Sequence, residues 1–252
     1  MVSPHVVSLL SVASGHLIIE LCSQFLPIIY PVLIDRLDLN YTQVGVLALV
    51  ASVGTSIAQP IFGYVSDLWD PRRLSALSVA WIGVIMGLVG FVDQYAWIAL
   101  VIGLGVLGSA AFHPPAAMIA SSCGGERRAT AVSVFSVGGS LGSALSPLLV
   151  GAAIAHFGPR GTIVLAPIAV VLAVVLYVQL RNSDTERKES DDSCETSIDN
   201  RALIRLSLII LAVMCLAWFQ GSFRTYLPVW AESQGHSVAT GGRMLFVVLA
   251  AM

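Results

Sequence analysis

The stretch at residues 63–73 lies between two long apolar segments and reads Gly63-Tyr64-Val65-Ser66-Asp67-Leu68-Trp69-Asp70-Pro71-Arg72-Arg73. It concentrates charge in a chain of which only 11% of residues are charged. Glycine lets membrane helices approach closely, and a carboxylate beside guanidinium groups forms charge-assisted hydrogen bonds. We interpret Gly63, Asp67, Arg72 and Arg73 as a conformational latch at a helix–helix turn. The alternative is an ordinary positively charged loop with an incidental aspartate.

The composition indicates a membrane protein. The chain has 252 residues, of which 56% are hydrophobic, and its mean hydropathy is +0.85. Soluble domains are usually about 45–50% apolar and about 25% charged. The net charge of −2 provides no basic surface for nucleic acid. We therefore expect the lipid bilayer, and no nucleic acid, among the partners.

The sequence shows no pattern typical of an enzyme or a metal site. Its four cysteines are scattered, without a CxxC pair or a Cys–His pair at metal spacing. No His-x-x-Glu-His, Gly-x-Ser-x-Gly or phosphate-binding loop is present. We expect no enzyme activity, no catalytic residue, no cofactor and no metal.

Six segments approach or exceed the about 20 mostly apolar residues that a spanning helix needs. They are residues 6–34, 42–65, 74–91, 95–121, 129–156 and 161–180. Pro27 and Pro31 predict a kink in the first of them.

The segment 181–201 is charged and almost free of apolar residues, so we expect a solvated linker. A seventh helix is predicted over 202–230, and an eighth begins near Gly241. The eighth has only about a dozen residues before Met252, too few to cross the hydrocarbon. We expect a chain truncated in this helix. The predicted organisation is a six-helix bundle at 1–180, a cytoplasmic linker at 181–201 and the start of a second bundle at 202–252.

The basic residues predict the orientation, because cytoplasmic loops carry the excess of Lys and Arg. Nine basic residues fall at one set of helix ends and three at the other, and the nine are Arg72, Arg73, Arg127, Arg128, Arg181, Arg187, Lys188, Arg201 and Arg205. We therefore expect a multi-pass protein of the cell membrane with a cytoplasmic N-terminus.

Two tripeptides indicate parallel halves. Phe25-Leu26-Pro27 in the first helix recurs as Tyr226-Leu227-Pro228 in the seventh, and each precedes an outer turn. Internal repeats of this kind are common in transporters.

Six helices, a charged linker and a second set that starts in the same way resemble the major facilitator superfamily. The stretch 63–73 lies where that family carries its G-x-x-x-D-R-x-x-R-K signature. It departs from the signature at Leu68, where the family has arginine, and at Asp70-Pro71. The resemblance implies an all-α membrane protein with a complete N-terminal six-helix bundle and the first one or two helices of a C-terminal bundle.

The fifth predicted helix contains a motif similar to one that exporters of this family carry. Gly138, Gly139 and Gly142 can bring helix backbones close together. Pro147 removes a helix hydrogen bond and favours a bend. The alternative is ordinary packing of small residues.

Several motifs over residues 10–180 resemble the fosmidomycin resistance protein family. They are His16-x-x-x-Glu20, Tyr41-Thr42-Gln43-Val44-Gly45, Gln59-Pro60-x-x-Gly63, Phe112-His113-Pro114 and Arg127-Arg128. That branch usually has aspartate at the position of Glu20 and glutamate at the position of Pro115.

Ionisable residues inside a membrane span are costly and are therefore functional candidates. His16, Glu20 and Gln24 are spaced i, i+4, i+8 and so share one helix face. The resemblance implies that the first, fourth and seventh helices line a central cavity. It therefore adds His113 of the fourth helix, with Gln220 and Arg224 of the seventh, to the candidates.

We interpret Glu20, His16 and His113 as proton-coupling residues, because a carboxyl group gains a proton in apolar surroundings and releases it beside a cation. Gln24, Gln220 and Arg224 are the substrate-binding candidates, and the planar fork of arginine suits an anionic group. The alternatives are a structural Glu20–His16 pair, a hydrogen bond that caps a hinge at His113, and a structural ion pair of Arg224, for example with Glu20.

These observations predict a transporter of small molecules. The partners would be a small-molecule substrate and protons, and the chain would export a small organic solute or drug by alternating access. The alternative is a truncated, non-transporting membrane protein, or a half-transporter that needs a second chain.

Overall fold

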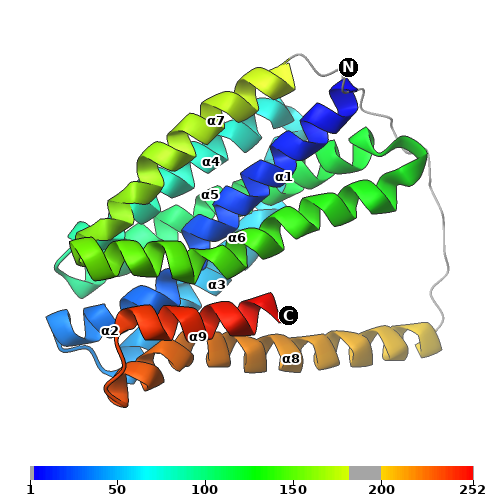
Figure 1. Cartoon of the computed structure of the whole chain (residues 1–252). Helices are drawn as coiled ribbons and strands as arrows, with labels where there is room; N and C mark the ends of the chain where they lie inside the picture. The colour runs from blue at the N-terminus through cyan, green and yellow to red at the C-terminus, as the bar shows by residue number, and fades with distance from the viewer. Residues whose placement is uncertain (1–2, 182–199, 252) are drawn as a thin grey trace.

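The structure is a computed structural model that describes residues 3–181 and 200–251, and every regular element within them is a helix (Figure 1). The α-helices are α1 Pro4–Ser23, α2 Leu26–Leu37, α3 Tyr41–Leu68, α4 Pro71–Gly87, α5 Tyr95–Cys123, α6 Arg128–Phe157, α7 Leu165–Arg181, α8 Asn200–Ser233 and α9 Val238–Ala250. Short 3-10 turns are η1 Val89–Phe91, η2 Gly125–Arg127 and η3 Pro159–Val164. The predicted all-α fold is confirmed. Most of the predicted linker lies outside the described residues.

Within residues 3–181 and 200–251, seven helical segments are long and apolar enough to cross a bilayer. Six of them match the six spans predicted before the linker, and the seventh is α8. The chain is therefore a multi-pass membrane protein. The predicted eighth helix corresponds to α9, a shorter apolar helix of 13 residues.

The first span is broken, where a single kinked helix was predicted. α1 ends at Ser23 and α2 begins at Leu26, so the break lies at Gln24 and Phe25. Pro27 lies in the first turn of α2, where the missing N–H of proline costs no helical hydrogen bond. The side chain of Gln24 consequently projects from a helix end, one turn after Glu20.

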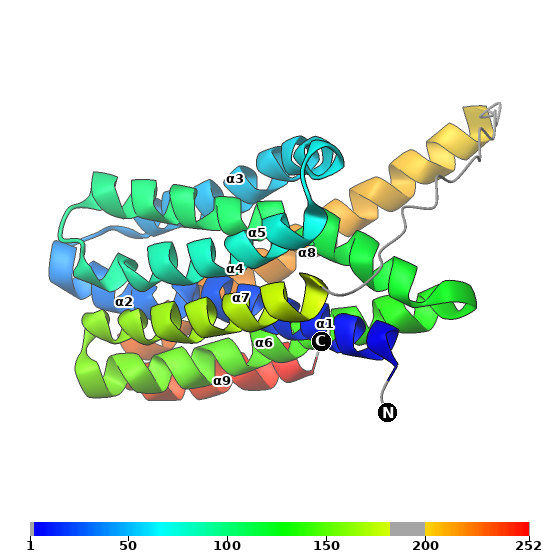
Figure 2. The same cartoon turned by 90° about the horizontal axis from the view of Figure 1, so that it is seen from above.

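The helices before the linker pack as one bundle. α1 packs against α6 and α5, α4 lies between α5 and α7, and α3 packs against α5 (Figure 2). Phe25, Tyr30, Phe112 and Met86 are among the fully buried side chains of its core. α3 and α7 bury few of their residues and leave about half of their apolar side chains exposed, as expected for helices that face lipid.

Two glycines allow the close contact between α1 and α6. A Cβ atom on Gly138 would overlap with the carbonyl oxygen of Ala13, and one on Gly142 would overlap with that of Leu17. The two helices therefore touch backbone to backbone, which only glycine permits.

Among the described residues, α8 contacts the bundle through α2, and α9 packs against α6. The Tyr226 hydroxyl donates to the Tyr41 carbonyl oxygen at 3.0 Å. A Cβ atom on Gly242 of α9 would lie 2.6 Å from the Pro147 carbonyl oxygen of α6. We call these two contacts the end contact. Residues 203–219 of α8 are all exposed, and this part of the helix extends away from the bundle (Figure 1).

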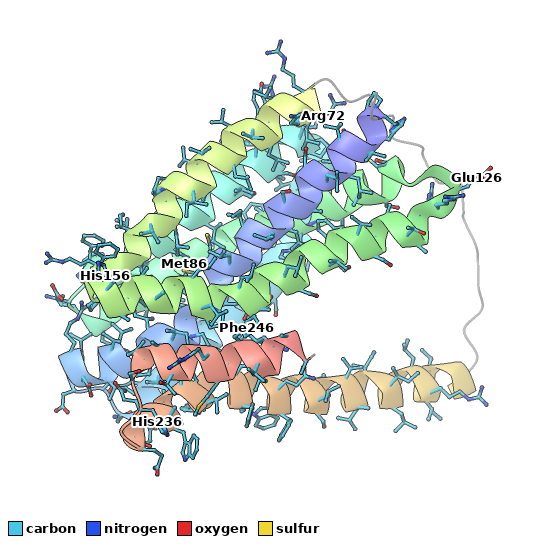
Figure 3. All side chains as sticks on the ribbon, in the orientation of Figure 1. Arg72, Met86, Glu126, His156, His236 and Phe246 are labelled. Carbon is cyan, nitrogen blue, oxygen red and sulfur yellow. The ribbon has the colours of Figure 1, made fainter. Side chains whose placement is uncertain are left out.

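Charged side chains lie at both ends of the bundle, and two labelled residues mark each end. Arg72 and Glu126 lie at one end, whereas Met86 and His156 lie at the opposite end (Figure 3). Arg72 donates a hydrogen bond to the carbonyl oxygen of Arg181 at the first end. Arg36 and Arg160 contact the turn around η1 at the other end.

Replacement of Arg36 by alanine is expected to lower the free energy of unfolding by about 2 kcal/mol, because hydrogen bonds from charged groups contribute about 1.5–3 kcal/mol each. The Arg36 guanidinium donates to the carbonyl oxygens of Gly90, at 3.1 Å, and Val92, and it lies 3.4 Å from Asp93 Oδ1. Denaturant titration in micelles measures the change. The control is Arg243→Ala, which loses a bond to Thr240 on its own helix. Equal destabilisation by both variants would contradict this role of Arg36.

Candidate functional site

Glu20 lies at the centre of a polar cluster within the apolar bundle. Its side chain is 15% exposed, and its Oε1 atom faces two histidines. The Nε2 atom of His113, from α5, lies 3.4 Å from this oxygen, and the Nε2 atom of His16, one turn earlier on α1, lies 3.8 Å away.

The second carboxylate oxygen of Glu20 accepts hydrogen bonds from two neutral side chains. Gln24 Nε2 donates to Oε2 at 2.9 Å, and the Ser143 hydroxyl of α6 donates at 3.2 Å. The carboxylate is therefore fixed in orientation by Gln24, just after α1, and by Ser143 of α6, and Oε1 remains for the histidines.

Backbone carbonyl groups orient both imidazole rings. His16 Nδ1 lies 2.9 Å from the Phe135 carbonyl oxygen, and His113 Nδ1 lies 2.7 Å from that of Ser109. A carbonyl oxygen only accepts, so the hydrogen-bond network assigns a hydrogen to each Nδ1 atom. Each Nε2 atom then turns a lone pair toward Glu20 Oε1 unless it carries a proton. A proton or another cation must therefore lie between these atoms for the contacts to be attractive.

The His16 ring also packs against two other rings, those of Phe135 and His113. The His16 ring stacks on Phe135 with centroids 4.2 Å apart, and it meets the His113 ring edge-on at 5.1 Å. A Cβ atom on Gly139 would overlap with the His16 ring. α6 therefore helps to position His16 through a glycine, a backbone carbonyl and an aromatic face.

The structure brings together the three residues predicted for proton coupling, and it adds Gln24 to them. Gln220 and Arg224 lie elsewhere, on α8, and both are partly buried. Within residues 3–181 and 200–251, Glu20 pairs with His16 and His113.

Ser143 and Phe135 are contacts of the cluster that the sequence did not indicate. Ser143 is adjacent to Gly142 in the glycine motif, and its position there is the one signal that could have found it. Phe135 contributes a backbone carbonyl, which no sequence pattern reveals.

The residues of the expected latch lie around the turn between α3 and α4. A Cβ atom on Gly63 would meet nothing within 4 Å, so this glycine does not serve a close helix approach. Asp67 lies in the last turn of α3, and Arg72 and Arg73 lie in the first turn of α4.

Asp70, a departure from the family signature, provides several contacts of this turn. It caps α4 by accepting from the Arg72 backbone N–H at 3.0 Å, and its Oδ2 lies 3.5 Å from Arg73 Nε. The Arg72 side chain donates to the Arg181 carbonyl oxygen at 3.4 Å. Asp70, Arg72, Arg73, Tyr177 and Arg181 line a shallow pocket between α4 and α7.

The sequence profile of the Major Facilitator Superfamily matches residues 12–252. The fosmidomycin resistance protein of Escherichia coli (strain K12) is 27% identical over 251 residues, which cover 96% of this chain and 61% of that protein. An uncharacterized MFS-type transporter of Bacillus subtilis (strain 168) is 28% identical over 163 residues, or 64% of this chain and 39% of that protein. The chain thus spans less than two thirds of the length of these relatives. The predicted resemblance to both families is confirmed.

Solved structures share the fold. A bacterial homologue of the human lysosomal transporter Spinster, in an inward-facing and unoccupied conformation, superposes with a TM-score of 0.84 at 14% identity. The match covers 99% of this chain and 60% of that one. A D-xylose–proton symporter superposes with a TM-score of 0.64 at 16% identity, over 98% of this chain and 65% of that one.

Proposed function

Because this chain belongs to the Major Facilitator Superfamily, we propose that it works as a proton-coupled exporter of a small organic solute or drug by alternating access. The observation that carries the proposal is the cluster of Glu20, His16 and His113, in which a carboxylate faces two imidazole nitrogens inside an apolar bundle. Similarity to a fosmidomycin resistance protein supports efflux of a small drug. The symporter with the same fold is named for proton coupling.

The cluster supplies a way to load and release a proton. A proton held between His113 Nε2 and Glu20 Oε1 makes their 3.4 Å contact an ion pair. His113 belongs to α5 and Glu20 to α1, so a shift between these helices weakens the pair. The proton is then released, because a carboxylate and an imidazole stabilise each other's charge only at short range.

Substrate would bind between the bundle and α8. Gln24 at the break after α1 and Gln220 and Arg224 on α8 are the proposed contacts. Arg224 would bind an anionic group of the substrate through its guanidinium fork. Such a substrate would meet the bundle beside the proton site, because Gln24 donates directly to Glu20.

The conformation supports a cavity that is open at one end. The end contact joins α8 and α9 to the bundle, whereas residues 203–219 of α8 are exposed. By the excess of arginine, the open end would face the cytoplasm, together with the N-terminus and the linker 181–201. Residues 1–180 and 202–252 would then be the two moving units.

The proposed latch and packing residues would govern the movement of these units. Asp67, Arg72 and Arg73, with Gly63 nearby, lie at the proposed cytoplasmic end, where α3, α4 and α7 meet. Gly138, Gly139, Gly142 and Pro147 of α6 contact α1 and α9, so α6 joins the proton site to the end contact.

Solute-driven proton movement in liposomes tests the proposal. Purified chain is reconstituted with a pH-sensitive dye inside acid-loaded vesicles, and fosmidomycin is added outside as the first of a panel of small drugs. Antiport predicts solute uptake together with alkalinisation of the lumen, and a protonophore should abolish the uptake. Vesicles without protein are the control. Uptake that is insensitive to the protonophore would show that transport is not proton-coupled.

A further inference from the structure

The side chains around Glu20 offer a set of metal ligands that the sequence analysis did not predict. We infer that Glu20 Oε1, His16 Nε2 and His113 Nε2 form a three-ligand site for a transition-metal dication, with Zn²⁺ as the best-matched ion. Binding at this site does not require the chain to transport anything, so the inference goes beyond the proposed function.

The distances between the ligand atoms fit a single ion. Zn²⁺ binds nitrogen and oxygen at about 2.0–2.2 Å, so neighbouring ligand atoms of a tetrahedral site lie about 3.3–3.5 Å apart. His113 Nε2 and Glu20 Oε1 are already 3.4 Å apart. His16 Nε2 lies 3.8 Å from the same oxygen, and all three atoms lie within 4.8 Å of one another. A single ion between the three atoms would require His16 Nε2 to move closer to Glu20 Oε1 by a few tenths of an ångström.

The surrounding hydrogen bonds hold the ligands in the form that a metal needs. A metal-binding histidine usually donates its other ring N–H to a carbonyl or carboxylate, which fixes the ring and its tautomer. His16 does so to the Phe135 carbonyl and His113 to the Ser109 carbonyl. Gln24 and Ser143 hold the other carboxylate oxygen in the same way.

The chemical types of the three ligands determine which class of metal ion the site would prefer. Two imidazoles and one carboxylate suit Zn²⁺ and neighbouring transition metals, whereas Mg²⁺ and Ca²⁺ prefer oxygen ligands alone. Three protein ligands leave a fourth position for water. The His113 side chain is 26% exposed, so an ion has access to the cluster.

The site has a consequence for transport, and this consequence alone rests on the proposed function. A metal ion would occupy the space in which the coupling proton lies. Zn²⁺ would therefore inhibit proton coupling, while binding itself is measured without any transport.

Titration of the purified, tag-free chain in nanodiscs tests the site. We expect one tightly bound Zn²⁺ per chain by calorimetry. Co²⁺ should give the visible absorption bands of a four-coordinate site, and excess Mg²⁺ should not displace it. Loss of a hydrogen bond around a metal ligand already weakens affinity about 10–100-fold, so His113→Gln and His16→Gln should each weaken Zn²⁺ binding by about 100-fold or more.

Matched variants separate this site from adventitious binding. His236→Gln removes a histidine at the far end of the bundle and should leave the Zn²⁺ affinity unchanged (Figure 3). Ser143→Ala removes only a supporting hydrogen bond and should weaken binding by about 10-fold. Circular dichroism shows that each variant is folded. Absence of the Co²⁺ bands in the unaltered chain, or equal Zn²⁺ affinity in the folded His16→Gln and His113→Gln variants, would overturn the inference.

Discussion

Glu20→Gln is expected to reduce solute-driven proton movement by about 100-fold, the lower end of the effect of removing a proton-transfer group. The amide has nearly the same shape as the carboxyl group, so the packing of α1, α5 and α6 is preserved. It carries no negative charge, however, and it cannot accept the proton that we propose is shared between Oε1 and His113 Nε2. Proton movement into or out of dye-loaded liposomes measures the loss.

Two further measurements make this prediction specific. Exchange of labelled solute across the membrane without a pH gradient should persist in Glu20→Gln, because exchange needs the alternating movement but no net proton. Glu126→Gln alters an exposed carboxylate in η2 and should transport as the unaltered chain does. Full proton-coupled transport by Glu20→Gln would refute a role for Glu20 in coupling.

Gly142→Val is expected to lower the free energy of unfolding by about 3 kcal/mol, at the upper end of the usual cost of overpacking. The added Cβ atom would overlap with the Leu17 carbonyl oxygen. That atom belongs to the backbone of α1 and cannot rotate away, so the two helices must separate. Separation would also displace Ser143 from Glu20, so proton coupling should weaken in the same variant. Denaturant titration in mixed micelles measures the stability.

The matched control for this change is Gly221→Val. Gly221 also lies within a helix, but a Cβ atom there would meet nothing within 4 Å. Its effect on stability should stay within about 0.5 kcal/mol, as for surface substitutions in general. Similar losses in both variants would mean that the cost comes from valine in a helix rather than from the α1–α6 contact.

Much of the fold could be predicted because a bilayer imposes a minimum length of apolar sequence on each span. The hydropathy of the sequence was enough to predict the spans, and the prolines predicted an irregularity in the first helix. The exact break at Gln24 and Phe25 depends on which backbone hydrogen bonds survive around Pro27. The surroundings of Gly63 could not be predicted from the sequence either, since only the packed structure shows that they are open.

The sequence could predict only those residues of the candidate site whose spacing matches the helical repeat or whose position matches a family motif. The spacing of His16, Glu20 and Gln24 placed them on one face of α1, and family resemblance added His113. Ser143 and the carbonyl of Phe135 reach Glu20 and His16 through tertiary packing, which leaves no spacing to read. The distances between the three metal-ligand atoms could not be predicted either, because they depend on how α1 packs against α5.

Because α8 is long and is held near one end by the end contact, a small tilt there would displace its other end by a large distance. From Tyr226 back to Leu203 the helix is about 35 Å long, at 1.5 Å per residue. A tilt of about 10° at the Tyr226–Tyr41 hydrogen bond would therefore swing the distant end of α8 by about 6 Å, comparable with one helical turn. A small tilt at this contact would thus be enough to move the distant end of α8 relative to the bundle.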